Sequence, residues 1–184
     1  MRFDNGVPFA SPNGLFNLSR LAVWWLRLGV TIERIQPGHP QQNGRQERMH
    51  RSLKMEATRP AGSNFLPRQA KFDAFVHEFN NHRPHQALAM KFPANVYKST
   101  RPYRGIGELS FPFHDRTVLV TCCGRICIFK KKINLSTSLA GQAVGIKEVD
   151  EGIWLVSFID YDLGHIDLKE KTLQPLDNPF GSRV

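Results

Sequence analysis

Apolar residues recur at helical spacing within the first thirty residues of the chain. Steps of three and four place these residues on one face of a helix. Ser11 followed by Pro12 predicts where the helix begins, because serine caps helices and proline fits their first position. Gly29 predicts where it ends, since glycine often stands just past a helix. The predicted apolar stripe consists of Leu18, Leu21, Trp25 and Leu28.

Two more helices are predicted further along the chain. A short strand at 30–35 and a loop rich in glycine and proline at 36–44 precede them. The first helix spans about 46–58 and the second about 68–80, because apolar side chains again recur every three or four residues. The buried stripes are predicted to be Met49, Leu53 and Ala57 in the first helix, and Phe72, Phe75, Val76 and Phe79 in the second.

From residue 117 onward the apolar pattern changes to a period of two, which is typical of strands. Turn residues such as Cys123-Gly124 and Leu163-Gly164 separate the alternating segments. Several short strands close together along the chain favour a small β-barrel. The predicted strands are 117–121, 125–130, 142–147, 153–159 and 165–169.

Charge is unevenly distributed along the chain, which carries a net +9. Residues 1–114 hold 16 basic and 7 acidic side chains, whereas residues 115–184 hold nine of each. A local basic excess attracts polyanions such as nucleic acid, because binding releases counterions from the phosphates. The same excess is equally compatible with a solvated surface. The overall composition, 41% hydrophobic and 22% charged, is ordinary for a folded protein and argues against a disordered chain.

Cysteine usage and hydropathy bear on the compartment. The cysteines at 122, 123 and 127 are odd in number and show no CxxC spacing, so we interpret them as small strand residues in a reducing environment. The most apolar stretch, 15–28, is too short to span a bilayer and contains two arginines. We therefore expect a cytoplasmic protein without a membrane partner.

Two segments hold residues suited to chemistry. Asp4-Asn5-Gly6 is typical of a strand that ends in a turn, and residues 37–48 combine a glycine- and proline-rich loop with the start of a helix. Arg51 and Lys54 lie four and seven residues after Glu47, so the three side chains project from one helix face. A carboxylate with basic groups one and two turns away suits a metal ion beside a phosphate backbone.

These pieces occur together with a third motif, in the order Asp4-Asn5-Gly6, Pro37…Pro40…Asn43-Gly44…Glu47-Arg48…His50…Leu53-Lys54, and Asn80-Asn81-His82-Arg83-Pro84-His85-Gln86-Ala87-Leu88. The set resembles transposases of bacterial insertion sequences, which have a retroviral-integrase-type catalytic core with an Asp-Asp-Glu triad. Each motif alone is weak, whereas the ordered set is specific. The resemblance extends over essentially the whole chain.

The resemblance implies an α/β fold class: a truncated, helix-rich RNase H-like integrase core over 1–90, a linker at 91–114, a five-stranded β-barrel at 115–177 and a tail at 178–184. It makes Asp4 the second and Glu47 the third triad member, close together and both ligands of a site for two Mg²⁺ (or Mn²⁺) ions. Residues expected to bind nucleic acid are Asn43, Arg45, Arg48, His50, Arg51, Lys54, Arg83 and His85.

The implied partner is double-stranded DNA, at the terminal repeats of the element and at the target, bound by a homo-oligomer in the bacterial nucleoid. The first aspartate of the triad lies upstream of the Asp-Asn-Gly turn in the family and has no counterpart here, so we expect this chain to be inactive alone. Two alternatives remain open. One is a non-catalytic DNA-binding or oligomerisation module derived from a transposase, and the other is a protein-interaction barrel with a helical appendage.

Overall fold

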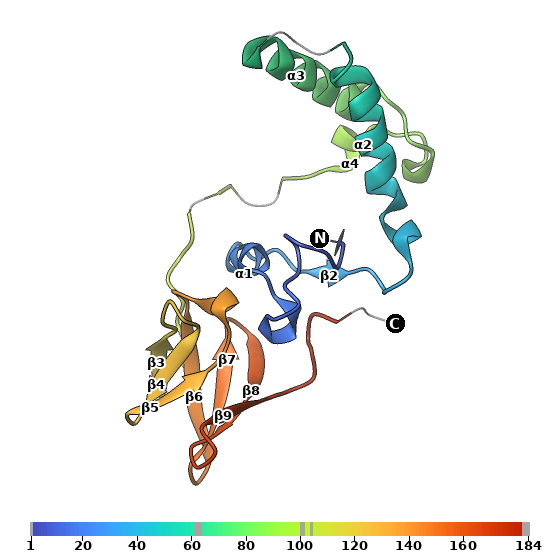
Figure 1. Ribbon diagram of the computed structural model, residues 1–184. Helices are drawn as coiled ribbons and strands as arrows, with labels where there is room; N and C mark the ends of the chain where they lie inside the picture. Colours follow the sequence, from blue (N-terminus) through green and yellow to red (C-terminus); the bar gives the residue numbers. More distant parts are fainter. Residues whose placement is uncertain (1, 61–63, 100–101, 104, 182–184) are drawn as a thin grey trace. The chain divides into compact units, whose positions relative to one another are not determined.

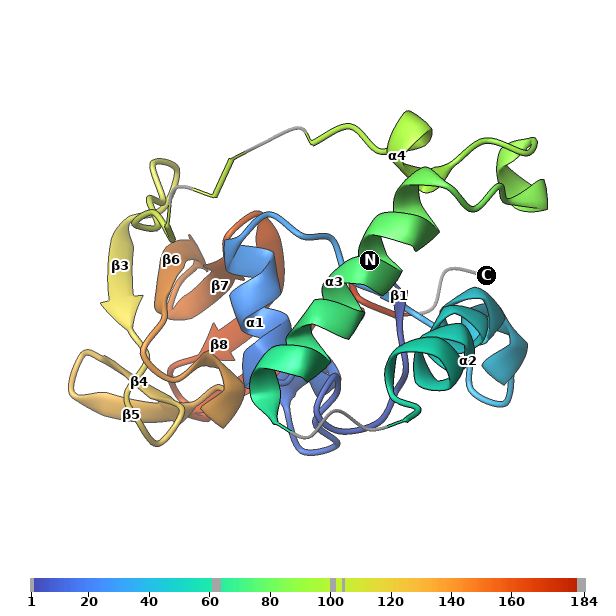
Figure 2. The ribbon, with the colours of Figure 1, turned by 90° about the horizontal axis from the view of Figure 1, so that it is seen from above.

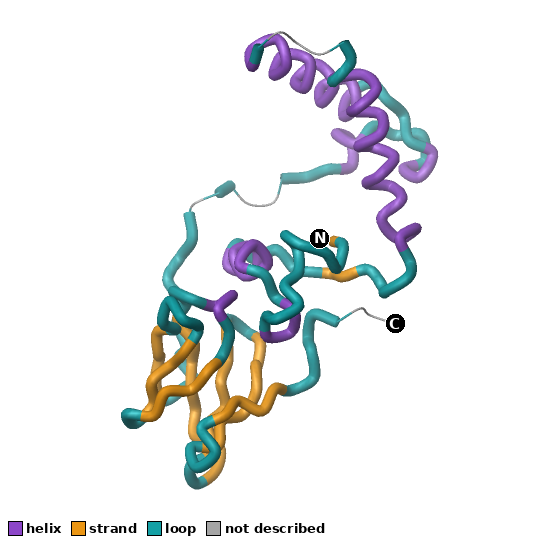
Figure 3. The backbone as a smooth tube through the Cα atoms, viewed as in Figure 1, coloured by secondary structure: helices purple, strands orange, loops and turns teal. Residues whose placement is uncertain are grey.

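The computed structural model describes residues 2–60, 64–99, 102–103 and 105–181 (Figures 1 and 3). The chain forms two compact units, which we call unit 1 and unit 2. Unit 1 combines Met1–Pro40 with Ile106–Val184, and unit 2 comprises Gln41–Gly105. These units are defined by contacts alone. The division at residues 90 and 115 that the resemblance implies remains a prediction.

The N-terminal part of unit 1 holds two short strands, β1 (Arg2–Phe3) and β2 (Glu33–Arg34), which pair in parallel. Between them lie the 3-10 helix η1 (Leu15–Asn17) and the helix α1 (Arg20–Arg27). The strand predicted over 30–35 is therefore reduced to two residues. Parallel pairing requires a crossover connection, and α1 supplies it.

Helix α1 begins at Arg20, so the predicted start after Ser11 was wrong. Phe16 and Asn17 adopt left-handed φ angles of 53° and 56°, and a right-handed helix cannot continue through them. Ser19 caps the helix instead, because its Oγ accepts the backbone N–H of Ala22 at 3.1 Å. The predicted end is confirmed, since Gly29 follows the helix with a φ of 73°.

The buried face of α1 also differs from the predicted stripe. Ala22, Val23 and Leu26 are the buried residues of this helix. Trp25 is half-buried and faces the two-stranded sheet, where its ring stacks on Phe3 with centroids 4.1 Å apart. The helix therefore packs on two sides, and a single apolar stripe describes only one of them.

The β-strands of unit 1 form an open antiparallel sheet in the order β3-β6-β7-β8-β9, with a separate hairpin β4-β5. All five predicted strands are present with shifted ends, and two strands, β5 and β9, were not predicted. The sheets stay open, so the predicted closed barrel is not observed. The bounds are β3 Arg116–Leu119, β4 Arg125–Ile128, β5 Lys131–Asn134, β6 Ala143–Asp150, β7 Ile153–Phe158, β8 Tyr161–Asp167 and β9 Thr172–Pro175.

A continuous hydrophobic core joins the N-terminal part of unit 1 to the β-strands, and α1 lies beside these strands (Figure 2). Helix α1 contacts the 3-10 helix η4 (Thr137–Leu139) between β5 and β6. Leu18 is fully buried in the same cluster as the sheet residues. Its members include Phe3, Leu18, Ala22, Leu26, Val120, Ile126, Ile133, Leu139, Val144, Ile146, Val156, Phe158, Leu163 and Ile166.

Unit 2 is built from helices: η2 (Pro40–Asn43) leads into α2 (Gly44–Ala57), which is followed by α3 (Phe65–Asn81), η3 (Gln86–Leu88) and α4 (Pro93–Val96). Both predicted helices are confirmed. Asn64 caps α3 through its Oδ1, which accepts the N–H of Leu66, so this helix begins earlier than predicted. Phe75 and Ala57 are buried, whereas Val76 is 52% exposed and lies outside the core.

Among the described residues, no helix has both the length and the apolar character needed to cross a membrane.

Replacing Leu18 tests whether the shared core stabilises unit 1. Leu18→Ala leaves a cavity at a fully buried position, so we expect the free energy of unfolding to fall by about 3 kcal/mol. Leu119→Ala is the matched control, because Leu119 lies in the same unit but is 65% exposed. Urea denaturation followed by tryptophan fluorescence measures both. Equal losses for the two variants would contradict the shared core.

Candidate nucleic-acid interface and catalytic carboxylates

Asp4 stands directly after β1 with its carboxylate exposed to solvent. Its Oδ1 accepts the backbone N–H of Asn5 at 2.6 Å. The Asn5 side chain in turn donates its Nδ2–H to the carbonyl of Ile35 at 2.8 Å, beside β2. The turn after β1 is thus tied to the neighbouring strand, and Asp4 is held at the carboxyl end of β1.

Glu47 occupies the first turn of α2, where a carboxylate is favoured by the positive end of the helix dipole. The side chain is exposed. It lines a hollow of about 730 Å³ on unit 2 that also involves His50, Arg51 and Lys54. Helical spacing places these side chains on one face, and the structure shows them around one hollow.

Basic side chains dominate the exposed surface of α2. Arg45, Arg48, Arg51 and Lys54 are all exposed, and among the described residues none of them forms an ion pair. Unpaired cations on a helix attract phosphate, because no internal carboxylate competes for them. Asn43 precedes this helix, and its side chain does not cap it. Two residues that the sequence analysis did not single out, Met55 and Arg59, line the same hollow.

Arg83, in contrast, forms ion pairs within unit 2. Its guanidinium donates two hydrogen bonds to Glu56, at 2.9 and 2.6 Å, and one to Glu78 at 2.7 Å. It also lies over the rings of Phe75 and Phe79, 5.7 and 5.9 Å from their centroids. The ion pairs connect α2, α3 and the segment after α3, so Arg83 holds these parts of unit 2 together.

The same contacts shift the ionisation of the groups. Hydrogen bonds to Glu56 and Glu78 raise the pKa of Arg83 further above its ordinary value. The hydrogen bond from Arg83 lowers the pKa of Glu56 below its ordinary 4.5.

His85 is also part of this packing. Its ring meets the ring of Phe79 edge-on, with centroids 4.8 Å apart. Its Nε2 is buried and has no hydrogen-bond partner among the described residues. The backbone around His85 folds back, since its N–H donates to the carbonyl of Lys91 and its carbonyl accepts the N–H of Leu88. The roles of Arg83 and His85 in DNA binding remain predictions, whereas their contacts within unit 2 are observed.

A divalent-metal site needs several ligands in one place. Carboxylate oxygens such as those of Asp4 and Glu47 are the class of ligand that Mg²⁺ and Mn²⁺ prefer. Among the described residues, however, no group of three or more His, Cys, Asp or Glu side chains is arranged to hold a metal ion. Asp4 belongs to unit 1 and Glu47 to unit 2, and their proximity remains a prediction.

Residues 28–93 match the sequence model of a family described as integrase core domain. This match supports a domain of the integrase or transposase type in that part of the chain, and with it a function in DNA integration and recombination. Glu47, the basic residues of α2, Arg83 and His85 all lie within the matched segment. Asp4 lies outside it, so its assignment as a catalytic residue remains a prediction from the motif.

The ion pairs of Arg83 predict that the stability of unit 2 depends on pH. Because the pKa of Glu56 is lowered in the folded chain, its contribution is present above the ordinary pKa of 4.5 and is lost as the pH falls through the lowered value. We expect Glu56→Gln to lower the melting temperature at neutral pH, and this difference to shrink as the pH falls below 4.5 and Glu56 becomes protonated.

Circular dichroism at the helical wavelength measures these melting temperatures. Glu151→Gln, in the exposed turn between β6 and β7, controls for the loss of a carboxylate without an ion-pair partner among the described residues. A destabilisation by Glu56→Gln that stayed constant from neutral to acid pH would show that Arg83 does not stabilise the unit through this charge.

Proposed function

We propose that this chain binds double-stranded DNA and acts in DNA cleavage and strand joining, as part of a bacterial insertion-sequence transposase. The observation that carries the proposal is the position of Glu47 on α2. It is an exposed carboxylate within the segment that matches the integrase core, and it shares a hollow with unpaired basic side chains.

The acidic and basic side chains of α2 have different roles in this proposal. Arg51 and Lys54 hold the phosphates of the DNA backbone, since cations with no internal partner gain most from phosphate contacts. Glu47 stands one turn before Arg51 and so faces the phosphodiester that these cations position. Asp4 contributes a second carboxylate at the end of β1. Asp4 and Glu47 would be ligands of Mg²⁺ or Mn²⁺, and the bound ion would supply activation of the attacking hydroxyl and stabilisation of the leaving oxygen.

The phosphate contacts are tested through salt dependence. The double variant Arg51→Ala/Lys54→Ala removes two proposed contacts, so the slope of log affinity against log salt should become shallower by about 0.9 per contact. Fluorescence anisotropy with a labelled duplex at several salt concentrations measures the slope. Lys147→Ala/Lys169→Ala removes two exposed lysines of unit 1 as a control. A slope that is unchanged in the first variant, or equally reduced in both, argues against α2 as the DNA contact.

The two carboxylates are tested through the effect of Mn²⁺ on DNA affinity. If Asp4 and Glu47 hold the ion beside a phosphate, Mn²⁺ strengthens DNA binding by the original chain. In Asp4→Asn and in Glu47→Gln we expect the Mn²⁺ concentration for half of this effect to rise at least about tenfold. Glu151→Gln should behave as the original chain. Full retention of the Mn²⁺ effect in both site variants would reject these ligands.

DNA joining separates the catalytic proposal from the DNA-binding alternative. Joining of element-end DNA to a target, with a loss in Glu47→Gln, is the outcome that the catalytic proposal requires of the assembled transposase. DNA binding that depends on Arg51 and Lys54 but shows no response to Mn²⁺ would favour a non-catalytic DNA-binding module instead.

A further inference from the structure

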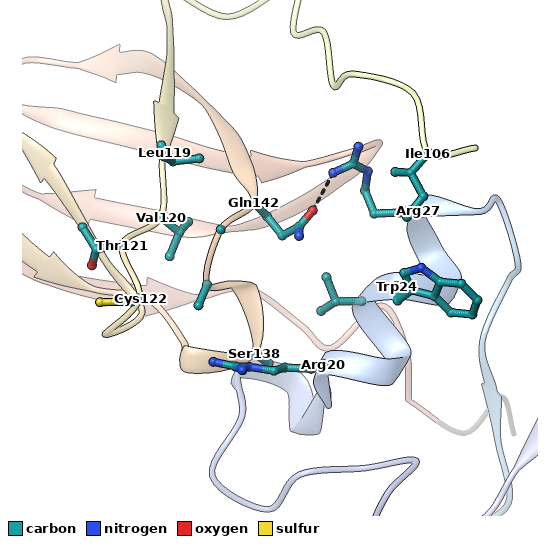
Figure 4. A pocket seen from close by; sticks show the side chains of 13 residues that line it. Arg20, Trp24, Arg27, Ile106, Leu119, Val120, Thr121, Cys122, Ser138 and Gln142 are labelled. Atoms are coloured by element: carbon teal, nitrogen blue, oxygen red, sulfur yellow. Dashed lines mark hydrogen bonds between the residues drawn. The ribbon is translucent and has the colours of Figure 1, made fainter. Parts of the chain in front are cut away.

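Unit 1 contains a pocket of about 560 Å³ between α1, β3 and the segment 138–142 (Figure 4). The pocket falls within the range of about 300–1,000 Å³ that is usual for small-ligand sites. Its lining combines apolar side chains with polar and charged ones. The polar, charged and aromatic lining residues that the argument uses are Arg20, Trp24, Arg27, Thr121, Ser138 and Gln142.

One face of α1 supplies the charged side of the pocket. Trp24 and Arg27 lie four and seven residues after Arg20, so helical geometry aligns the three side chains on one side of the helix. Trp25, which stacks on Phe3, lies on another side of the helix, whereas the buried residue Val23 also lines the pocket. The helix therefore presents Arg20, Trp24 and Arg27 to the pocket beside its buried face.

The two arginines differ in how they are held. Arg27 donates from Nη1 to Gln142 Oε1 at 2.5 Å, and from Nη2 to the carbonyl of Gly107. Arg20 is exposed, and no carboxylate among the described residues pairs with either arginine. None of the described residues that line the pocket is acidic. An anion is therefore the ligand that this charge distribution favours.

Trp24 adds a flat apolar surface beside these cations. Its side chain is 45% exposed although tryptophan is usually buried, and Figure 4 shows its indole at the edge of the pocket near Arg27 and Ile106. An exposed indole in a pocket with two arginines that lack carboxylate partners among the described residues suits a ligand that carries both a planar ring and a phosphate. A nucleotide has both groups. A base can stack on a side chain only when it is unpaired, because its faces are covered inside a duplex.

We propose that this pocket binds one unpaired nucleotide of a DNA strand, with its phosphate on Arg20 and its base against Trp24. Arg27 is held by Gln142 and keeps its charge beside the phosphate. The proposal rests on the proposed function, since it assumes that the chain binds DNA. It adds a contact in unit 1 that selects unpaired DNA, in addition to the duplex contacts of α2.

The test compares a fluorescein-labelled oligothymidine of about ten nucleotides with a duplex of equal length, using the full chain. Trp24→Ala should weaken oligothymidine binding about tenfold, while Trp24→Phe, which keeps an aromatic face, should retain most of the affinity. Arg20→Gln should weaken binding and reduce the salt slope by about 0.7. Phe113→Ala and Lys169→Gln remove an exposed aromatic ring and an exposed cation outside the pocket, and should leave binding unchanged.

Circular dichroism checks that each variant is folded. If Trp24→Ala does not fold, Arg20→Gln tests the proposal in its place. Oligothymidine affinity that is equal in the original chain and the folded pocket variants overturns the pocket. An equal loss for duplex and oligothymidine in Trp24→Ala overturns the selection of unpaired DNA. Binding of duplex without oligothymidine overturns the pocket and leaves the proposed function intact, whereas binding of neither overturns both.

Discussion

The ion pairs of Arg83 link the helices of unit 2. Few of its described side chains are buried, so hydrophobic packing alone holds its helices weakly. Arg83 compensates by joining Glu56 on α2 to Glu78 on α3 while it covers Phe75 and Phe79. Glu56 lies nine residues after Glu47, and at about 100° per residue the two project from opposite sides of α2. The ion pair to Arg83 thus lies on one side of α2, and the side that carries Glu47, which we propose faces DNA, remains exposed.

Elements with a local signal were predictable from the sequence. The two long helices of unit 2 follow from their apolar period, and Gly29 marks the end of α1 correctly. The start of α1 was not predictable, because Phe16 is a non-glycine residue in a left-handed conformation that only the surrounding packing selects. The strand β5 has a single apolar residue, Ile133, and its hairpin turns at Phe129-Lys130 with positive φ but without glycine or asparagine. Pairing between strands, and hence the open sheet, depends on contacts distant in sequence.

In the candidate site, too, some features follow from a local sequence pattern and others do not. Glu47, Arg51 and Lys54 lie within two turns of one helix, so their common face followed from the helical period alone. The ion pair between Arg83 and Glu56 joins residues that are 27 apart, and no local pattern indicates it. A basic residue in a motif therefore has two distinct uses that the sequence does not separate, to bind a partner or to hold the fold. Only the contacts of the guanidinium distinguish them.

The same criterion explains why the basic excess of the chain is informative only after the ion pairs are known. Residues 1–114 carry the whole net charge of +9, and the β-rich remainder is neutral. Within the basic part, Arg2 and Arg83 are paired with carboxylates, whereas Arg20 and the arginines of α2 have no such pairs among the described residues. Unpaired cations therefore occur in both units, on α1 and on α2. The strands of unit 1 leave the charge of Arg20 without a carboxylate partner among the described residues, and this exposed charge is the basis of the anion site that we propose on α1.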